Sequence, residues 1–263
     1  MDRIFRIERD HRAVYALRNT DDTGWLYLDG DPFGEYSAGD AIDEDGVRLL
    51  PPVLPSKIVA VGLNYRDHAR EMNKPLPDEP LIFLKPSTAV IGPGDAIVMP
   101  PQAGRVDYEA ELGIVIQKRA KAVPAASAAE FILGLTCVND VTARDLQTRD
   151  VQYTRAKGFD TFAPIGPCIV VGLDGSALDV ESSVNGERRQ ASNTRELIFG
   201  LHHLVEFISS VMTLLPGDVI ATGTPSGVGP VTPGDRVVVK VEGIGELANE
   251  VATDASLHGG LAP

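Results

Sequence analysis

The stretch Val106-Asp107-Tyr108-Glu109-Ala110-Glu111-Leu112-Gly113-Ile114-Val115-Ile116 constrains the fold of this 263-residue sequence more than any other. Read with the period of two that is typical of a β-strand, it predicts one strand with two different faces. One face is apolar and belongs to a core. The other face carries Asp107, Glu109 and Glu111, so it places carboxylates side by side.

Two of these carboxylates, Glu109 and Glu111, stand about 6–7 Å apart along a strand and point the same way. At about 6 Å and an effective dielectric constant near 20, two negative charges repel by about 3 kcal/mol. Either water screens this repulsion or a cation removes it. Taken alone, the stretch favours the commoner interpretation, which is an amphipathic strand with a solvated acidic face.

Composition excludes several classes of protein. The net charge of −13 argues against a nucleic-acid partner and against an anionic membrane surface. No run approaches the roughly 18 apolar residues of a membrane-spanning helix, and charges interrupt residues 1–9, which therefore do not resemble a signal peptide. Cys137 and Cys168 lie in apolar runs, so we expect two buried, reduced thiols in a cytoplasmic protein.

The pattern of short apolar runs separated by Gly and Pro predicts a mainly β, α+β chain in two parts. Residues 1–52 form a small β-rich N-terminal domain with strands near 14–17 and 25–28, and the proline-rich segment 51–55 connects it to a larger domain, residues 53–263. In the larger domain we expect strands at 57–61, 81–86, 133–138, 219–221, 237–241 and 247–251. We expect helices at 128–133, from 141 and at 197–215, and a hairpin turn at Asn185-Gly186.

A short helix after the strand at 57–61 carries a candidate pair of side chains. Asn64 resembles the N-cap of this helix. His68 and Glu71 are then i,i+3 neighbours and can touch. A surface His–Glu pair is about as good an interpretation as a functional one, in which the carboxylate orients a histidine that deprotonates water.

Three carboxylates on strands or strand ends form the candidate metal site. Glu109, Glu111 and Asp140 offer oxygen ligands only, which suits Mg²⁺ or Mn²⁺, with Ca²⁺ as a possible substitute. Zinc is disfavoured because the cysteines lie elsewhere and because His202 and His203, which we interpret as structural, lack a third ligand. The loop 222–229 is rich in hydroxyls and backbone amides that could hold a carboxylate.

Together these motifs resemble the fumarylacetoacetate hydrolase family. The resemblance is carried by Asn64-Tyr65 with His68 and Glu71, then by Phe83-Leu84-Lys85-Pro86, Asp107-Tyr108-Glu109-Ala110-Glu111-Leu112, Asn139-Asp140-Val141-Thr142-Ala143-Arg144-Asp145, Lys157-Gly158-Phe159-Asp160 and Thr222-Gly223-Thr224-Pro225-Ser226-Gly227-Val228-Gly229. It covers about residues 53–251, in the family's order.

The resemblance implies a fold, an assembly and a set of roles. The fold would be a mixed β-sheet roll, and the chain would form a homodimer. Glu109, Glu111 and Asp140 would hold the metal, and His68 with Glu71 would activate water on a segment that closes over the substrate. Lys157 would face the reacting centre, and Arg144, Gln147, Thr224 and Lys85 would bind the substrate, a small oxo acid.

The leading hypothesis from the sequence is hydrolysis of a carbon–carbon bond in a 2,4-dioxo acid of the acylpyruvate or fumarylpyruvate type. The metal would stabilise the enolate of pyruvate as leaving group, and Lys157 the developing oxyanion. The alternative is decarboxylation of oxaloacetate or isomerisation of a 2-hydroxyhepta-2,4-diene-1,7-dioate type of substrate from aromatic catabolism. A catalytically silent metal-binding scaffold is a third hypothesis.

Overall fold

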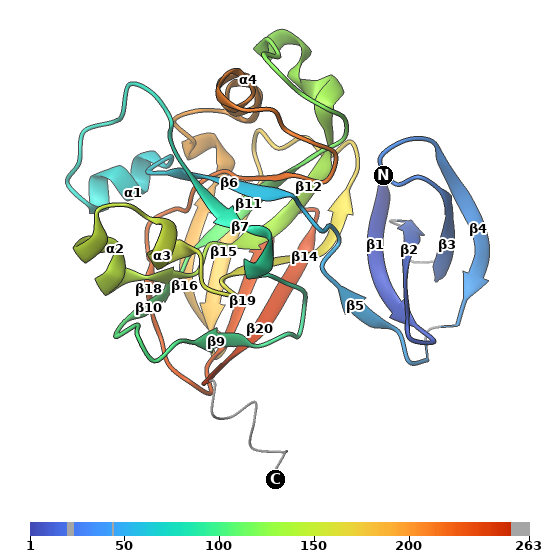
Figure 1. Cartoon of the computed structure of the whole chain (residues 1–263), viewed down its shortest axis with the longest axis horizontal. Coiled ribbons are helices and arrows are strands. Elements are labelled where there is room, and N and C mark those ends of the chain that lie inside the picture. The colour runs from blue at the N-terminus through green and yellow to red at the C-terminus, as the bar shows by residue number, and fades with distance from the viewer. Residues whose placement is uncertain (20–23, 44, 254–263) are drawn as a thin grey trace.

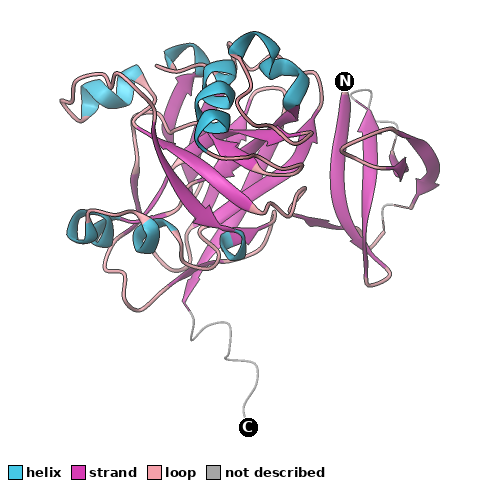
Figure 2. Ribbon diagram, turned by 45° about the horizontal axis from the view of Figure 1, so that its top comes forward, coloured by secondary structure: helices cyan, strands magenta, loops and turns pink. Residues whose placement is uncertain are grey.

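A computed structural model describes residues 1–19, 24–43 and 45–253 of the chain. The fold is mainly β, with mixed sheets in the centre and short helices around them (Figures 1 and 2), so the predicted fold class is confirmed. No helix in this described part is long and apolar enough to cross a membrane.

A large sheet of twelve strands runs through the molecule. Ten of them follow the order β4-β3-β2-β1-β14-β12-β11-β17-β6-β7, while β5 pairs with β1 and β8 with β14. Its strands are β1 (Asp2–Arg9), β2 (Arg12–Asn19), β3 (Trp25–Gly30), β4 (Tyr36–Ile42), β5 (Arg48–Leu50), β6 (Lys57–Gly62), β7 (Leu81–Pro86), β8 (Val90–Ile91), β11 (Ala110–Ile116), β12 (Ile132–Asn139), β14 (Ala163–Val170) and β17 (Val219–Ala221).

Two smaller sheets and seven helical segments complete the described fold. The sheets are β13 (Thr142–Ala143), β10 (Val106–Tyr108) and β18 (Gly229–Val231), and β16 (Glu187–Asn193), β15 (Asp179–Val184), β19 (Arg236–Val241), β20 (Gly245–Thr253) and β9 (Ile97–Met99). The α-helices are α1 (Arg66–Glu71), α2 (Arg144–Asp150), α3 (Thr154–Lys157) and α4 (Leu201–Val211). The 3₁₀ segments are η1 (Ser87–Ala89), η2 (Ala125–Phe131) and η3 (Thr194–Glu196).

The N-terminal strands β1–β4 lie to one side of the molecule, at the right of Figure 1. They join the large sheet through β1, which pairs with β14 at Arg3↔Val170 and Ile4↔Ile169. The division into residues 1–52 and 53–263 stays a prediction, and residues 254–263 of the second part lie outside the described chain. Cys137 and Cys168 are free and buried, as expected.

The predicted single strand at 106–116 is wrong in two respects. The strand breaks at Glu109 into β10 and β11, which belong to different sheets. The break is held by side chains, because the Glu109 and Ala110 backbone N–H groups donate to Asn139 Oδ1 and to Gln190 Oε1. The acidic face is also not solvated: Asp107, Glu109 and Glu111 are 1%, 6% and 1% exposed.

Helix boundaries differ from the predictions where tertiary contacts decide them. Asn64 does not cap α1, whose N-cap position is Tyr65. Its buried amide instead accepts from Phe199 N at 2.8 Å and donates to the carbonyls of Phe199 and Thr222 at 3.0 and 2.8 Å. The helix from 141 begins at Arg144, and α4 is shorter than the predicted 197–215. The predicted helix at 128–133 is a 3₁₀ segment that leads into β12.

Because the Asn64 amide ties α1 to two distant segments, we expect Asn64→Ala to lower the free energy of unfolding by about 2–4 kcal/mol. The substitution leaves one backbone N–H and two carbonyls buried without partners. Urea unfolding of this variant beside Gln102→Ala, on an exposed turn, provides the measurement. A loss below 0.5 kcal/mol, on the order of a surface substitution, would contradict the role given to Asn64.

Candidate active site

The antiparallel pairing of β11 with β12 brings the three predicted metal ligands together. Ala110 pairs with Asn139, and Asp140 N donates to Glu109 O at 2.9 Å. Asp140, just after the end of β12, therefore lies opposite Glu109, just before the start of β11. Glu109 and Glu111 project from the same side of this edge. Carboxylate oxygens of Glu109, Glu111 and Asp140 all lie within 4.8 Å of one another, and all three residues are buried.

Two buried lysines partly balance this cluster of negative charge. Lys157 Nζ lies 2.8 Å from Glu109 Oε2 and 2.6 Å from Asp140 Oδ2. Lys85 Nζ donates to Asp140 Oδ1 at 2.5 Å and to the Val141 carbonyl at 3.1 Å. Burial lowers the pKa of Lys85, whereas for Lys157 the charges of Asp140 and Glu109 outweigh burial and raise the pKa. Lys157 is therefore a firmly protonated ammonium.

The two glutamates respond in opposite directions to their surroundings. Burial raises the pKa of Glu109, but the charges of Lys157 and Arg144 prevail and hold it at about 2. Burial and the charges of Asp140 and Glu109 raise the pKa of Glu111 well above its ordinary value. Its hydrogen-bond partner is the Gly223 N–H, at 2.8 Å, and among the described residues Glu111 has no direct cationic partner of the kind that Glu109 and Asp140 have.

These observations fit a divalent cation. Three carboxylates with oxygens close together make a hard, anionic donor set, which is the set that Mg²⁺ and Mn²⁺ prefer. A cation beside Glu111 would also remove the repulsion that raises the pKa of this residue. The three carboxylates could therefore hold a metal ion, as the sequence predicts.

The predicted His–Glu pair forms on α1, next to the carboxylates. His68 Nδ1 lies 2.9 Å from Glu71 Oε2, and the other carboxylate oxygen of Glu71 accepts from Gly227 N at 3.1 Å. The start of α1 is fixed by Ser192 Oγ, which donates to Asp67 at 2.6 Å. Because Nδ1 is engaged by Glu71, Nε2 is the ring nitrogen left for a substrate.

One cavity of about 390 Å³ joins these groups. It is lined by nine of the ten predicted site residues, namely His68, Glu71, Glu109, Glu111, Asp140, Arg144, Gln147, Lys157 and Thr224. Lys85 is not among the lining residues and is fully buried behind Asp140. Its predicted role in substrate binding and the other predicted roles stay predictions.

Thr224 and Gln147 occupy the cavity wall through fixed hydrogen bonds. Thr224 Oγ1 donates to the Ala110 carbonyl at 2.9 Å and accepts from Gln190 Nε2 at 2.8 Å. Gln147 Oε1 accepts from Arg144 Nη1 at 2.6 Å. Both side chains are thus held in place before any ligand arrives.

The sequence predictions assigned no site role to three charged residues that line this cavity, Lys74, Arg105 and Asp107. Asp107 is 1% exposed and binds two guanidinium groups, those of Arg105 and Arg144. Alternation along residues 106–116 places Asp107 on the same face as Glu109, which is the signal for Asp107. The pattern of a single strand does not show the arginines that pair with it.

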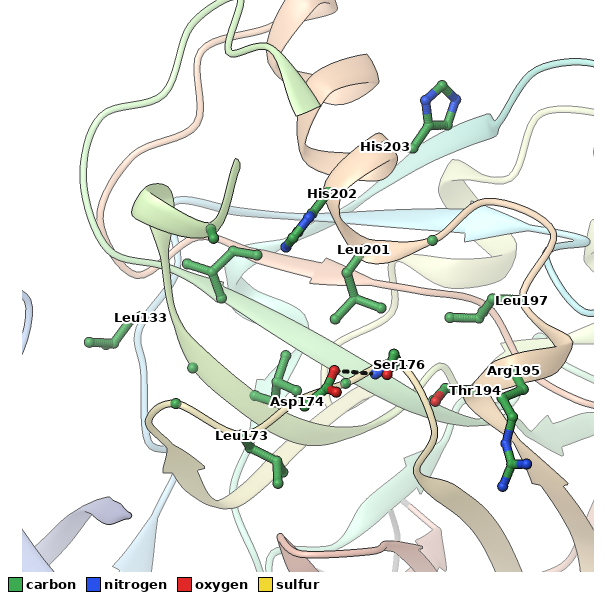
Figure 3. A pocket seen from close by; sticks show the side chains of 17 residues that line it. Leu133, Leu173, Asp174, Ser176, Thr194, Arg195, Leu197, Leu201, His202 and His203 are labelled. Atoms are coloured by element: carbon green, nitrogen blue, oxygen red, sulfur yellow. Dashed lines mark hydrogen bonds between the residues drawn. The ribbon is translucent and has the colours of Figure 1, made fainter. Parts of the chain in front are cut away.

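A second pocket, of about 700 Å³, lies at the start of α4, away from the carboxylates (Figure 3). Its wall is mostly apolar, with Leu133, Leu173, Leu197 and Leu201. The rings of His202 and His203 point in different directions there, and His203 Nδ1 lies 3.5 Å from Glu206 on its own helix. Within the described residues these two histidines are not part of the cluster of three carboxylates, and their interpretation as structural stays a prediction.

Comparison with known proteins identifies the family. Residues 57–252 match the fumarylacetoacetate (FAA) hydrolase C-terminal family. The chain therefore belongs to the fumarylacetoacetate hydrolase family, as its motifs predict, and members of this family are enzymes that generally depend on a divalent metal.

Three similar proteins carry informative names. The chain is 43% identical, over 215 residues, to the mitochondrial oxaloacetate tautomerase FAHD2B of Bos taurus, a match that covers 77% of this chain and 68% of the bovine protein. The structure of 5-carboxymethyl-2-hydroxymuconate delta-isomerase from Mycobacterium smegmatis is 48% identical, with a TM-score of 0.90 and coverage of 96% and 100%. That of 2-hydroxyhepta-2,4-diene-1,7-dioate isomerase from Mycobacterium marinum is 44% identical, with a TM-score of 0.89 and coverage of 97% and 99%.

The position of Glu111 leads to a test of the metal site. We expect Mg²⁺ or Mn²⁺ to raise the melting temperature of the wild-type chain and to bind Glu111→Gln roughly 100-fold more weakly. Without metal, the same variant should melt no lower than the wild type, because a neutral amide relieves the repulsion from Asp140 and Glu109. Calorimetric melting with and without metal measures both effects.

The matched control is Glu250→Gln, on an exposed position of β20. It should keep the metal-induced rise in melting temperature unchanged. An unaltered metal response in Glu111→Gln would contradict the assignment of Glu111 as a ligand.

Proposed function

We propose that the chain is a divalent-metal-dependent enzyme that moves a proton between carbon and oxygen in a short 2-oxo dicarboxylate of the oxaloacetate type. The reaction class is tautomerisation or isomerisation. The observation that carries the proposal is the balance of charge around the cavity, together with His68, which lines the same cavity.

The cavity is lined by four basic side chains and five carboxylates. The basic residues are Lys74, Arg105, Arg144 and Lys157, and the acidic residues are Glu71, Asp107, Glu109, Glu111 and Asp140. Lys85 adds a fifth basic group directly behind Asp140, where it donates to two oxygens. We count all ten groups in their ionised forms, which a bound cation would favour for Glu111. The charges then balance. A divalent cation would leave an excess of two positive charges, which matches a dianion better than the monoanion of a simple acylpyruvate.

The size of the cavity and the names of the relatives support the same substrate class. About 390 Å³ lies in the lower part of the range for small-molecule sites and suits a molecule of a few carbons. The names of the three relatives describe an oxaloacetate tautomerase and two isomerases of unsaturated acids. Reactions of this type all relocate a proton next to a carbonyl group.

In the proposed reaction, His68 Nε2 removes a proton from C3 of the keto form. The electron pair of that C–H bond becomes the C2=C3 double bond, and the π electron pair of the C2=O bond moves onto the oxygen. This oxygen then takes up the proton that His68 accepted, which returns the imidazole to its neutral form, and the reverse sequence regenerates the keto form. Glu71 holds His68 Nδ1 at 2.9 Å, orients the ring and stabilises the imidazolium. Lys157, whose pKa is raised, faces the same cavity as a cationic hydrogen-bond donor for the developing oxyanion.

A divalent cation at Glu109, Glu111 and Asp140 would supply Lewis acidity that polarises the 2-oxo group. The chain's own residues do the rest. Arg144 and Gln147 offer donors to the 1-carboxylate at the cavity wall, and Thr224 limits the space beside it.

The second candidate function is hydrolysis of a carbon–carbon bond in an acylpyruvate, the leading hypothesis from the sequence. The same His68–Glu71 pair favours it, because an oriented imidazole at an open cavity can also deprotonate a water molecule. This candidate comes second because an acylpyruvate such as acetylpyruvate is a monoanion, which matches the excess of two positive charges less well than a dianion does. Decarboxylation of oxaloacetate would use the same substrate and is separated by its product.

The test is an assay of chelator-stripped protein with oxaloacetate and with acetylpyruvate, each with and without Mg²⁺ or Mn²⁺. We expect the protein with metal to interconvert the enol and keto forms of oxaloacetate faster than the metal alone does. The change in ultraviolet absorbance measures this rate. His68→Ala should lower this rate about 10²- to 10⁴-fold. His202→Ala, at the second pocket, should leave it unchanged.

Each alternative outcome has a separate reading. Pyruvate with carbon dioxide from oxaloacetate, without faster tautomerisation, would move the assignment to a decarboxylase. Pyruvate with acetate from acetylpyruvate would move it to the hydrolase. A full rate in His68→Ala would contradict the role of the histidine in any of these reactions.

A further inference from the structure

Arg105 stands at the cavity with part of its guanidinium unused. Its side chain is 54% exposed and lines the cavity, and its Nε and Nη2 donate to Asp107 at 2.7 and 3.1 Å. Its remaining nitrogen, Nη1, makes no recorded hydrogen bond to the part of the chain that the structure describes. A fork of this kind can bind a further carboxylate.

The neighbouring arginine is in a different state. Arg144 donates through Nε to Asp107, through Nη1 to Gln147 and through Nη2 to Glu109. All three of its nitrogens are engaged within the wall of the site, and its side chain is only 28% exposed. Arg144 therefore has less donor capacity left for a ligand than Arg105.

Hydrogen bonds to the start of α2 hold the backbone of Arg105 close in sequence to the proposed metal ligand Glu109. Its carbonyl accepts from Arg144 N at 2.8 Å, at the start of α2, and Gly104 N donates to Asp145 at 3.2 Å. Residue 106 then begins β10, three residues before Glu109. Arg105 therefore lines the same cavity as the carboxylate cluster from a backbone position that these hydrogen bonds hold.

We propose that Arg105, aligned by the buried carboxylate of Asp107, binds the distal carboxylate of the substrate and so makes the site selective for dicarboxylates. This inference rests on the proposed function and adds a specificity residue to it. The two arginines then bind different ends of the substrate. Arg144 binds the 1-carboxylate, at the end near Glu109, and Arg105 binds the distal carboxylate.

Lys74 is the competing candidate for this role, because it also lines the cavity. It lies on the exposed loop after α1, and its side chain has no recorded hydrogen bond or ion pair within the described residues. A freely rotating ammonium loses more side-chain entropy on binding than a guanidinium that Asp107 already holds. The fixed group is therefore the better selector.

The experiment compares two ligands that differ only at the distal end. Oxaloacetate carries a carboxylate there and acetylpyruvate carries an acetyl group. The Mg²⁺-loaded full chain is studied by calorimetric binding and by turnover. We expect Arg105→Gln to weaken binding of oxaloacetate about 10- to 100-fold and to change that of acetylpyruvate less than about 3-fold.

Arg105→Lys should recover part of the affinity for oxaloacetate. The matched control is Arg149→Gln, an exposed arginine of α2 that does not line the cavity, and it should leave both affinities unchanged. Melting temperatures of all variants show whether the fold is intact.

Several results would overturn the inference. These are equal losses for both ligands in Arg105→Gln, no loss for either, or a dicarboxylate-selective loss in Lys74→Gln in place of Arg105→Gln. Selective binding of oxaloacetate without turnover would overturn the proposed function and leave the inference standing. Binding of neither ligand by the wild type would overturn both.

Discussion

The ion pairs of Lys157 with Glu109 and Asp140 are the interaction on which the rest of the site depends. Three carboxylates are buried within 4.8 Å of one another, and each buried charge costs several kcal/mol unless it is paired. Lys157 bridges two of them, at 2.8 and 2.6 Å, and Lys85 supports Asp140 from behind. Within the described residues Glu111 has only a backbone partner, so this one carboxylate lacks an adjacent cation even though the charges around the whole cavity balance.

The lack of a cation beside Glu111 connects the fold to the proposed chemistry. A protein gains nothing in stability by burying an unbalanced carboxylate, whereas a site that takes up a cation gains a ligand that completes it. Because β11 and β12 fix the positions of the carboxylates, the cation would enter a prepared geometry. The basic groups that line the same cavity would then receive an anionic substrate.

The sequence predicted the elements and the grouping of the site better than it predicted burial and boundaries. Periodicity found the strand at Leu112–Ile116, because a buried strand needs a continuous apolar run, and the motifs found nine residues that line one cavity. It misread Asn64 as an N-cap, because the partners of its amide, Phe199 and Thr222, are distant in sequence. It missed the break at Glu109 for the same reason, since Asn139 and Gln190 hold it.

The acidic face of the predicted strand at 106–116 illustrates the same limit. Alternation alone cannot tell a face covered by water from one covered by protein. The lysines that make burial tolerable, Lys85 and Lys157, stand 24 residues before and 48 residues after Glu109 in the sequence. Only the folded chain brings Lys157 to Glu109 and shows that Asp107, too, is buried against two arginines.

A divalent cation at the three carboxylates should prepare this cavity for a dianion. The most direct test is a calorimetric titration of the chelator-stripped chain with oxalate, an unreactive dianion with adjacent oxygens, with and without Mg²⁺ and corrected for complexes in solution. We expect binding at least about 100-fold tighter with Mg²⁺ than without it. Equal binding in both conditions, or none in either, would contradict it.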